Sequence, residues 1–147
     1  MNLQRRLTLP NDINAIPQLN EFLDTVFEEA GIVDMELTMT LNLAMEEAIV
    51  NVMDYAYPNG AEGTVSIDVM TDSELITFVI TDSGIPFDPT TAKDVDITLP
   101  AEERSIGGLG IHLIRQIMDD IKYERKDDKN ILTLRKYLNC ESENLNL

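Results

Sequence analysis

Two hydrophobic periodicities divide the chain into strands and helices. Apolar and polar residues alternate, as in half-buried strands, over Leu3–Leu9, Thr64–Thr71, Leu75–Asp82, Ile121–Arg125 and Ile131–Leu138. Apolar residues recur at helical spacing from Asn11 or Asp12 to Gly31, from Asp34 to Tyr57, and from Ile111 to about Asp120. Short links join the later strands into two hairpins, so we expect a largely antiparallel sheet. Three helices over one face of that sheet give an α+β two-layer sandwich.

The same pattern predicts one domain over residues 1–138 and a frayed acidic tail over residues 139–147. We expect Pro58-Asn59-Gly60 to end the second helix and Asp127-Asp128-Lys129-Asn130 to turn the last hairpin. Thr90–Ser105 has little periodicity, and a loop of this length inside a compact domain is usually functional or disordered. A mobile lid and a plain surface excursion both remain open, and the flanking residues favour the lid.

Composition narrows the classes of partner. The 11 basic and 27 acidic residues give a formal net charge of −16, which argues against direct binding to nucleic acid or an anionic membrane and suits a basic protein partner. The single cysteine, Cys140, cannot form an intrachain disulfide, which fits a cytoplasmic location. No apolar run approaches transmembrane length, and Met1–Pro10 lacks the apolar core of a signal peptide. A single histidine, His112, argues against the usual kind of zinc site.

The stretch Leu41–Pro58 combines an apolar helix with a row of polar side chains. Its apolar residues spread around most of the helix, which predicts burial. Glu47, Asn51 and Asp54 fall within a narrow arc, because positions three and four apart share a face. A buried row of this kind needs solvent, a metal ion or a ligand as its partner. The alternative is that Glu46, Glu47 and Asp54 form the solvated face of an ordinary surface helix.

Two further segments carry candidate chemistry. Gly107-Gly108-Leu109-Gly110 opens the third helix, where backbone amides and the helix dipole can hold a phosphate, although a tight turn would also explain the glycines. Asp82 ends an apolar strand and could accept a hydrogen bond from an exocyclic amine, with Gly84 leaving room for a planar base. A simple Asx turn is the alternative there. The chain has no P-loop, and a dinucleotide motif would need glycine where Leu113 stands.

In combination, these segments resemble the GHKL ATPase superfamily with its Bergerat nucleotide-binding fold. The motifs that match, in chain order, are the N-box Glu47–Asn51, the G1 box Asp82–Asp88 and the G2 box Gly107–Gly110. The length leaves no room for the further domains of gyrase-, mismatch-repair- or chaperone-type members. His112 follows the G2 glycines directly, so it cannot be the phosphoacceptor of a histidine kinase. What remains is similar to the RsbW-type anti-sigma-factor serine kinases, which the block Gly107–Asp119 resembles closely.

The resemblance implies a role for each matched residue. Glu47 would be the general base, Asn51 the magnesium ligand, and Asp82 the acceptor for the adenine amine. The remaining residues implied to bind nucleotide are Asp54, Tyr55, Gly84, Phe87, Arg104, Gly107, Gly108, Leu109, Gly110 and Thr133. Among these, Arg104 would approach the γ-phosphate and Thr133 would neighbour Asp82. Tyr55 replaces the first residue of a His-Gly pair found in many relatives, and could pack against the nucleotide or fill the core.

As a function, the resemblance implies a cytoplasmic protein-serine kinase that uses ATP and Mg²⁺. It would bind a sigma factor in one state and phosphorylate a STAS-type anti-anti-sigma protein in another. Relatives are commonly dimeric, which makes the first strand and helix candidate dimer surfaces. A catalytically inactive, nucleotide-gated binding protein is the main alternative, although such a protein has no need for a base at Glu47. An acidic interaction domain without nucleotide would require all three motif matches to be accidental.

Overall fold

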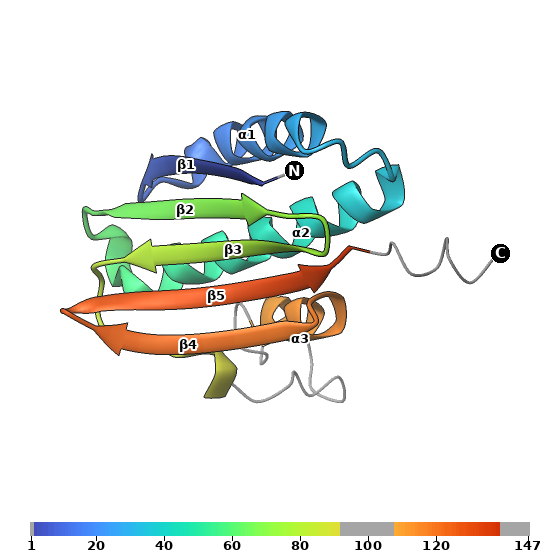
Figure 1. The fold of residues 1–147 in the computed structure, drawn as a ribbon. Helices are drawn as coiled ribbons and strands as arrows, with labels where there is room; N and C mark the ends of the chain where they lie inside the picture. Colours follow the sequence, from blue (N-terminus) through green and yellow to red (C-terminus); the bar gives the residue numbers. More distant parts are fainter. Residues whose placement is uncertain (1, 92–107, 139–147) are drawn as a thin grey trace, which may run out of the picture.

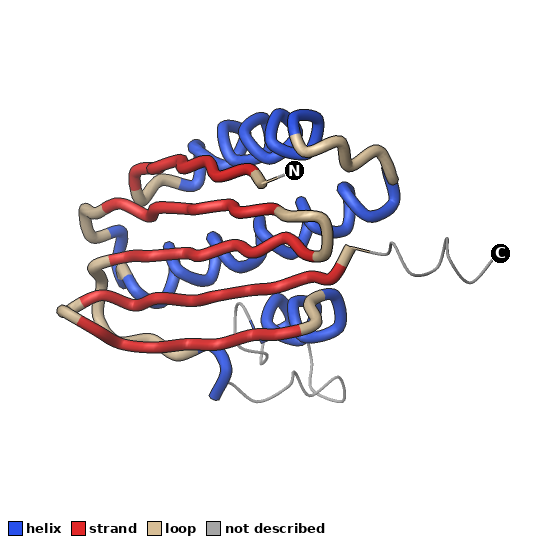
Figure 2. Tube along the Cα trace, in the orientation of Figure 1, coloured by secondary structure: helices blue, strands red, loops and turns tan. Residues whose placement is uncertain are grey.

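A five-stranded antiparallel sheet with helices on one face forms the protein, as a computed structural model describes it over residues 2–91 and 108–138 (Figures 1 and 2). The strands are β1 (Leu3–Pro10), β2 (Thr64–Thr71), β3 (Leu75–Asp82), β4 (Asp120–Lys126) and β5 (Lys129–Tyr137). The helices are α1 (Ile16–Glu29), α2 (Met35–Asn51) and α3 (Gly108–Ile117). The strand order is β1-β2-β3-β5-β4. The predicted α+β two-layer sandwich is therefore confirmed.

Side-chain caps explain where the first two helices begin. The Asp12 carboxylate accepts a hydrogen bond from the Asn14 N–H and starts a short 3₁₀ turn, so α1 begins only at Ile16. Gly31, at φ 76°, lies just beyond the end of α1 in the left-handed conformation that glycine adopts without strain. The Asp34 carboxylate accepts from the Leu37 N–H and caps α2. The third helix ends at Ile117, three residues before the predicted end.

The hairpin between β4 and β5 is tighter than the sequence pattern predicted. Asp127 and Asp128 both have positive φ, at 54° and 63°, as a two-residue turn of type I′ requires. The turn therefore consists of these two residues, and Lys129 and Asn130 belong to β5. This register pairs Asn130 with Asp82 at the end of β3. The hairpin thus delivers a polar side chain to the edge of the core.

Helix α2 packs on the sheet through one face only. Its core-facing residues are Leu41, Ala44, Met45, Ala48 and Ile49. On the opposite face Met35 and Met39 are 74% and 68% exposed, and Leu43 is 45% exposed. The expectation that α2 is buried nearly all round is therefore wrong, because the helix lies in an outer layer between α1 and α3 (Figure 1).

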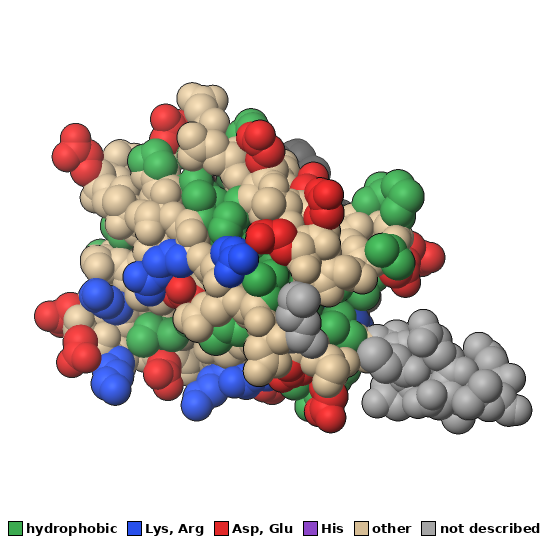
Figure 3. Space-filling model, turned by 45° about the horizontal axis from the view of Figure 1, so that its top comes forward, with side chains coloured by type: hydrophobic (Ala, Val, Ile, Leu, Met, Phe, Trp, Pro, Cys, Tyr) green, Lys and Arg blue, Asp and Glu red, His purple; other side chains and the backbone are tan. Residues whose placement is uncertain are grey.

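The other face of the sheet is polar and carries no helix in the described part of the chain (Figure 1). Arg6 donates to both carboxylate oxygens of Asp68 on the neighbouring strand, at 2.8 and 3.0 Å. Two residues further along the same strands, the hydroxyl groups of Thr8 and Ser66 are hydrogen-bonded to each other. Figure 3 shows basic, acidic and apolar side chains interspersed on the surface seen from this side. Within the described ranges, no helix is long and apolar enough to cross a membrane.

Candidate functional site

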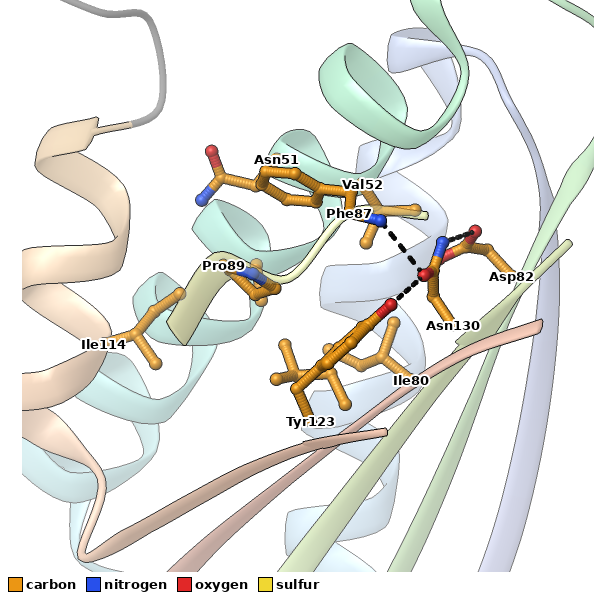
Figure 4. A pocket seen from close by; sticks show the side chains of 11 residues that line it. Asn51, Val52, Ile80, Asp82, Phe87, Pro89, Ile114, Tyr123 and Asn130 are labelled. Carbon is orange, nitrogen blue, oxygen red and sulfur yellow. Dashed lines mark hydrogen bonds between the residues drawn. The ribbon is translucent and has the colours of Figure 1, made fainter. Parts of the chain in front are cut away.

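A small pocket lies where α2, α3 and the ends of β3 and β5 meet (Figure 4). It is lined by Ala48, Asn51, Val52, Ile80, Asp82, Phe87, Pro89, Ile114, Tyr123, Asn130 and Leu132. The wall is mainly apolar, with one carboxylate, two amides and one phenol. The cavity volume is about 10 Å³, which is room for roughly one water molecule. A planar base can therefore enter only if part of the wall moves. Phe87 belongs to a loop and Pro89 to a short 3₁₀ helix, whereas Ile80 and Leu132 belong to strands.

Among the described residues of this wall, Asp82 is the only carboxylate, and it is 3% exposed. Its Oδ1 accepts hydrogen bonds from the Asn130 Nδ2 at 2.9 Å and from the Gly84 N–H at 2.8 Å. Burial raises the pKa of Asp82 above its usual value, while these two bonds and the positive charge of Arg125 oppose the rise. A buried carboxylate with one oxygen occupied in this way can still accept a hydrogen bond from an amine of a ligand.

The neighbour of Asp82 is Asn130, which the sequence analysis missed, and not Thr133. Successive side chains of a strand point to opposite faces. Asn130, Leu132 and Leu134 are buried on the helix side of β5, so Thr133 lies on the polar face, where it pairs with Val79. The assignment of Thr133 to the adenine site is therefore corrected. Counting strand pairs back from a two-residue turn at Asp127-Asp128 would have found Asn130.

Gly84 packs too closely on a neighbouring segment of the protein to carry a side chain. A Cβ atom at this position would overlap the carbonyl oxygen of Ala56, and would lie 2.7 Å from its carbonyl carbon and 2.8 Å from its Cβ. The Ile85 N–H also donates to the Ala56 carbonyl at 2.9 Å. The G1 box therefore packs against the end of the helical segment that continues α2 to Ala56. The missing side chain makes room for the backbone of Ala56, and room for a base beside Gly84 stays a prediction.

Gly84→Ala is therefore expected to lower the free energy of unfolding, by about 1–3 kcal/mol, as overpacking usually does. Urea denaturation followed by circular dichroism measures this change. Ser83→Ala is the matched control, because Ser83 is exposed and precedes Gly84 directly. If Gly84→Ala unfolds at the same urea concentration as Ser83→Ala, the close packing on Ala56 is wrong. A loss of nucleotide binding without a loss of stability would restore the original reading of Gly84.

A widened turn separates Asp54 from the other two polar residues of its predicted row. Val52–Ala56 forms a π-helical turn directly after α2, and such turns occur frequently at functional sites. The wider turn changes the phase of the helix, so Asp54 is exposed and does not line the pocket. It borders a separate groove with Asn11, Ile13, Met53, Tyr57, Asn59 and Gly60. Asp54 therefore lies outside this pocket, and its assignment to the nucleotide site stays a prediction.

Asn51 is 3% exposed, and its Nδ2 has no hydrogen-bond partner among the described residues. Figure 4 shows its carboxamide pointing away from Asp82 and toward the side on which α3 lies. Glu47 is half-buried one helical turn earlier, on a neighbouring position of the same face. An unpaired buried amide is unfavourable by about 1–3 kcal/mol. Asn51 is thus the kind of buried group that a bound ligand would satisfy.

Tyr55 and Phe87 stack on each other, with ring centroids 5.0 Å apart and an interplanar angle of 22°. Phe87 lines the pocket, and Tyr55 supports it from behind. Burial, with a smaller effect from the Asp54 charge, raises the pKa of Tyr55. Of the two roles expected for Tyr55, the structure supports neither direct contact with the pocket nor burial in the core.

The G2 glycines Gly108 and Gly110 lie with Leu109 in the first turn of α3. The first N–H groups of a helix have no partner inside the helix and favour an anion. Arg104, Gly107 and residues 92–105 of the predicted lid lie outside the described residues, as does the tail 139–147.

The described residues suit a magnesium ion that is coordinated mainly by phosphate and water oxygens and by few protein atoms. The described residues contain no group of three or more His, Cys, Asp or Glu side chains that could hold a metal. Mg²⁺ needs no such group, because it is usually bound by one or two protein ligands together with phosphates and water. A half-turn of the Asn51 carboxamide presents its oxygen in place of the unpaired nitrogen, so the residue present suits that role.

Comparisons of sequence and fold identify the family of this chain. The family described as histidine kinase-like ATPase domain matches residues 9–136, which is most of the chain. The chain belongs to this GHKL ATPase family. In fold, the family member resembles the Acinetobacter baumannii histidine kinase AdeS, with a TM-score of 0.51 and 16% identity over 92% of this chain and 69% of that one.

Among curated proteins, this GHKL family member is similar to kinases named for serine, or for serine and threonine. It is 29% identical to the serine/threonine-protein kinase BtrW of Bordetella bronchiseptica over 106 residues, which are 72% of this chain and 75% of that protein. It is 30% and 32% identical to the serine-protein kinases RsbW of Listeria monocytogenes and Halalkalibacterium halodurans. Both of these matches cover 67% of this chain, and 65% and 61% of the two RsbW proteins.

Proposed function

We propose that this protein is an ATP-dependent protein-serine kinase of a partner-switching module. It would sequester a sigma factor and phosphorylate a STAS-type anti-anti-sigma protein. One observation carries the nucleotide half of the proposal: the buried Asp82 carboxylate faces an apolar pocket. The wall of that pocket also holds the Asn51 amide, whose nitrogen has no hydrogen-bond partner in the described part of the chain. The similarity to BtrW, named a serine/threonine-protein kinase, and to RsbW, named a serine-protein kinase, supports the choice of serine as the acceptor.

In this proposal each side chain performs one task. Asp82 accepts a hydrogen bond from the adenine amine, and the first turn of α3 receives phosphate oxygens at Gly108 and Gly110. When bound, Mg²⁺ would be held by Asn51 and would neutralise charge on the phosphates. Glu47 takes the proton from the substrate serine as the serine oxygen bonds to the γ-phosphorus. The bond between that phosphorus and the bridging oxygen breaks, and ADP leaves with the electron pair.

The partners follow from charge and linkage. A chain of net charge −16 suits a basic surface on a protein partner. If ATP and ADP favour different partners, each partner must also change the affinity for nucleotide, because binding linkage is reciprocal. We further propose a homodimer, for which β1 is a candidate surface because it is an edge strand of the sheet. One catalytic domain over residues 1–138 and a cytoplasmic location complete the proposal.

The test combines binding with transfer. Calorimetry measures the affinity for Mg-ATP and Mg-ADP, and mass spectrometry detects phosphoserine on a STAS-domain protein encoded beside this one. Binding with transfer is the expected result. Binding without transfer to any such protein would favour the catalytically inactive, nucleotide-gated binding protein. If the wild-type protein binds neither nucleotide, both versions are wrong.

A further inference from the structure

Asn130 lies at the centre of the hydrogen bonds that surround the pocket. It is the second residue of β5, it is 4% exposed, and the antiparallel register places it opposite Asp82. Figure 4 shows it between Asp82, Phe87 and Tyr123, which come from three other segments of the chain. The motifs recognised in the sequence gave this residue no role.

The side-chain amide of Asn130 is fully used by the protein. An amide of this kind has two N–H donors and an oxygen with two lone pairs. Its Nδ2 donates to Asp82 Oδ1 at 2.9 Å and to the Ile85 carbonyl at 2.8 Å. Its Oδ1 accepts from the Phe87 N–H at 3.1 Å and from the Tyr123 hydroxyl. A reversed amide would bring two acceptors against its oxygen, so the amide has one orientation and no capacity left for a ligand.

This arrangement fixes the carboxylate of Asp82. Among the described residues, Asp82 receives hydrogen bonds from Asn130 and from the Gly84 N–H, and both end on Oδ1. Oδ2 is therefore the oxygen left for a ligand, and its direction is set by the two bonds to its partner oxygen. The charged and titratable groups that face Asp82 from β4 are Arg125 and Tyr123. Among the interactions that favour the ionised form of Asp82, the donation from Asn130 is the largest.

We propose that Asn130 is a positioning residue that holds Asp82 as a fixed, ionised acceptor and thereby makes the pocket select 6-amino purines over 6-oxo purines. The inference rests on the nucleotide function proposed above. An adenine amine donates to a carboxylate oxygen, whereas the 6-oxo group of hypoxanthine would meet it as acceptor against acceptor. Without Asn130, Asp82 protonates more readily, and a protonated carboxyl can donate to the 6-oxo group.

Two variants test the proposal through binding of Mg-ADP and Mg-IDP, measured by calorimetry over a range of pH. Asn130→Asp preserves the size of the side chain, removes both donors and places a second carboxylate beside Asp82. It is expected to weaken Mg-ADP binding by about tenfold or more and to reduce the preference over Mg-IDP. Because the pKa of Asp82 would rise further, ADP binding should be lost at a higher pH than in the wild type as the solution is acidified.

Tyr123→Phe is the second variant, and it decides the question if Asn130→Asp does not fold. It keeps the ring and the net charge but removes one of the four bonds that hold the amide. A change of about threefold in the same direction is expected for ADP affinity. Asn42→Asp is the matched control: Asn42 donates to the Asp24 carboxylate at 3.0 Å between α1 and α2, outside the pocket. Asn42→Asp also replaces an asparagine that donates to an aspartate, and it should leave the affinities for Mg-ADP and Mg-IDP unchanged.

The outcomes that would overturn the inference can be told apart from one another. If the variants weaken ADP and IDP by the same factor, Asn130 supports only the shape of the pocket. If they bind both nucleotides as the wild type does, the positioning role is wrong while the proposed kinase stands. The wild type is measured first, so an absence of nucleotide binding identifies a failure of the proposed function itself.

Discussion

Replacing Glu47 by glutamine is expected to lower the rate of phosphoryl transfer by about 10²–10⁴-fold, the usual contribution of a general base. The affinity for Mg-ATP should stay unchanged, because glutamine keeps the shape and polarity of the side chain and loses only the capacity to take a proton. Glu47 is half-buried one turn before Asn51 on α2, which places the base beside the proposed magnesium ligand. Transfer is measured as phosphoserine formed under single-turnover conditions, and binding by calorimetry.

Glu46→Gln is the control for this experiment. Glu46 is also half-buried, and its substitution removes the same charge. Its side chain, however, lies about 100° from that of Glu47 around the helix. It should transfer phosphate at the wild-type rate. Equal rates for Glu47→Gln and the wild type would show that the base is another residue. Loss of Mg-ATP binding in Glu47→Gln would instead make Glu47 part of the binding site.

The sequence predicted the fold because each level of pattern pointed to the same answer. Strand alternation, helix caps at Asp12 and Asp34 and the glycine at 31 all agree with the observed elements. The pocket also contains three of the residues that the motifs indicated, Asn51, Asp82 and Phe87. Asn51 and Asp82 stand at the ends of regular elements, where spacing along the chain translates directly into position in space.

The failures arose where geometry departs from regular periodicity. Asp54 left the predicted row because Val52–Ala56 is a π turn, and no propensity in the sequence distinguishes that turn from a continued α-helix. Thr133 was placed on the wrong face because a strand changes face at every residue. Once the two-residue turn at Asp127-Asp128 is known, the same alternation of faces identifies Asn130 as the neighbour of Asp82.

Gly84 shows a different limit. Its position in the motif was recognised, but its neighbour is the Ala56 backbone, 28 residues earlier in the chain. A contact of that kind depends on how the end of α2 docks on the G1 segment, which no local pattern specifies. The same applies to the exposed Met35 and Met39, because their exposure depends on where α1 and α3 pack.

Asp82→Asn is expected to weaken Mg-ADP binding by about 10- to 100-fold, the range for losing a hydrogen bond to a charged group. The asparagine oxygen can still accept from the Gly84 N–H, so the loop should keep its place. Its amide nitrogen, however, would face the adenine amine as donor against donor. The same nitrogen can donate to a 6-oxo group, so Mg-IDP should bind this variant better than Mg-ADP. Calorimetry with both nucleotides measures the exchange of preference.

The stability of Asp82→Asn separates this loss from unfolding. Because burial raises the pKa of Asp82, the folded protein binds this proton more tightly than the unfolded chain does. The ionised carboxyl therefore destabilises the fold above its folded pKa, and the effect disappears as the pH falls below the unfolded value. Asp82→Asn removes that charge, so at neutral pH it should unfold at an equal or higher urea concentration than the wild type. The advantage should vanish on acidification.

Asp68→Asn is the control that makes both measurements specific. It removes the same charge from the polar face of the sheet, where Asp68 pairs with Arg6. An exposed pair of this kind contributes about 0–1 kcal/mol, so only a small loss of stability and no change in ADP or IDP affinity are expected. If Asp68→Asn weakens ADP as strongly as Asp82→Asn, overall charge governs binding and the adenine assignment is wrong. If only Asp82→Asn changes the binding preference from Mg-ADP to Mg-IDP, the direction of one hydrogen bond in the pocket selects the base.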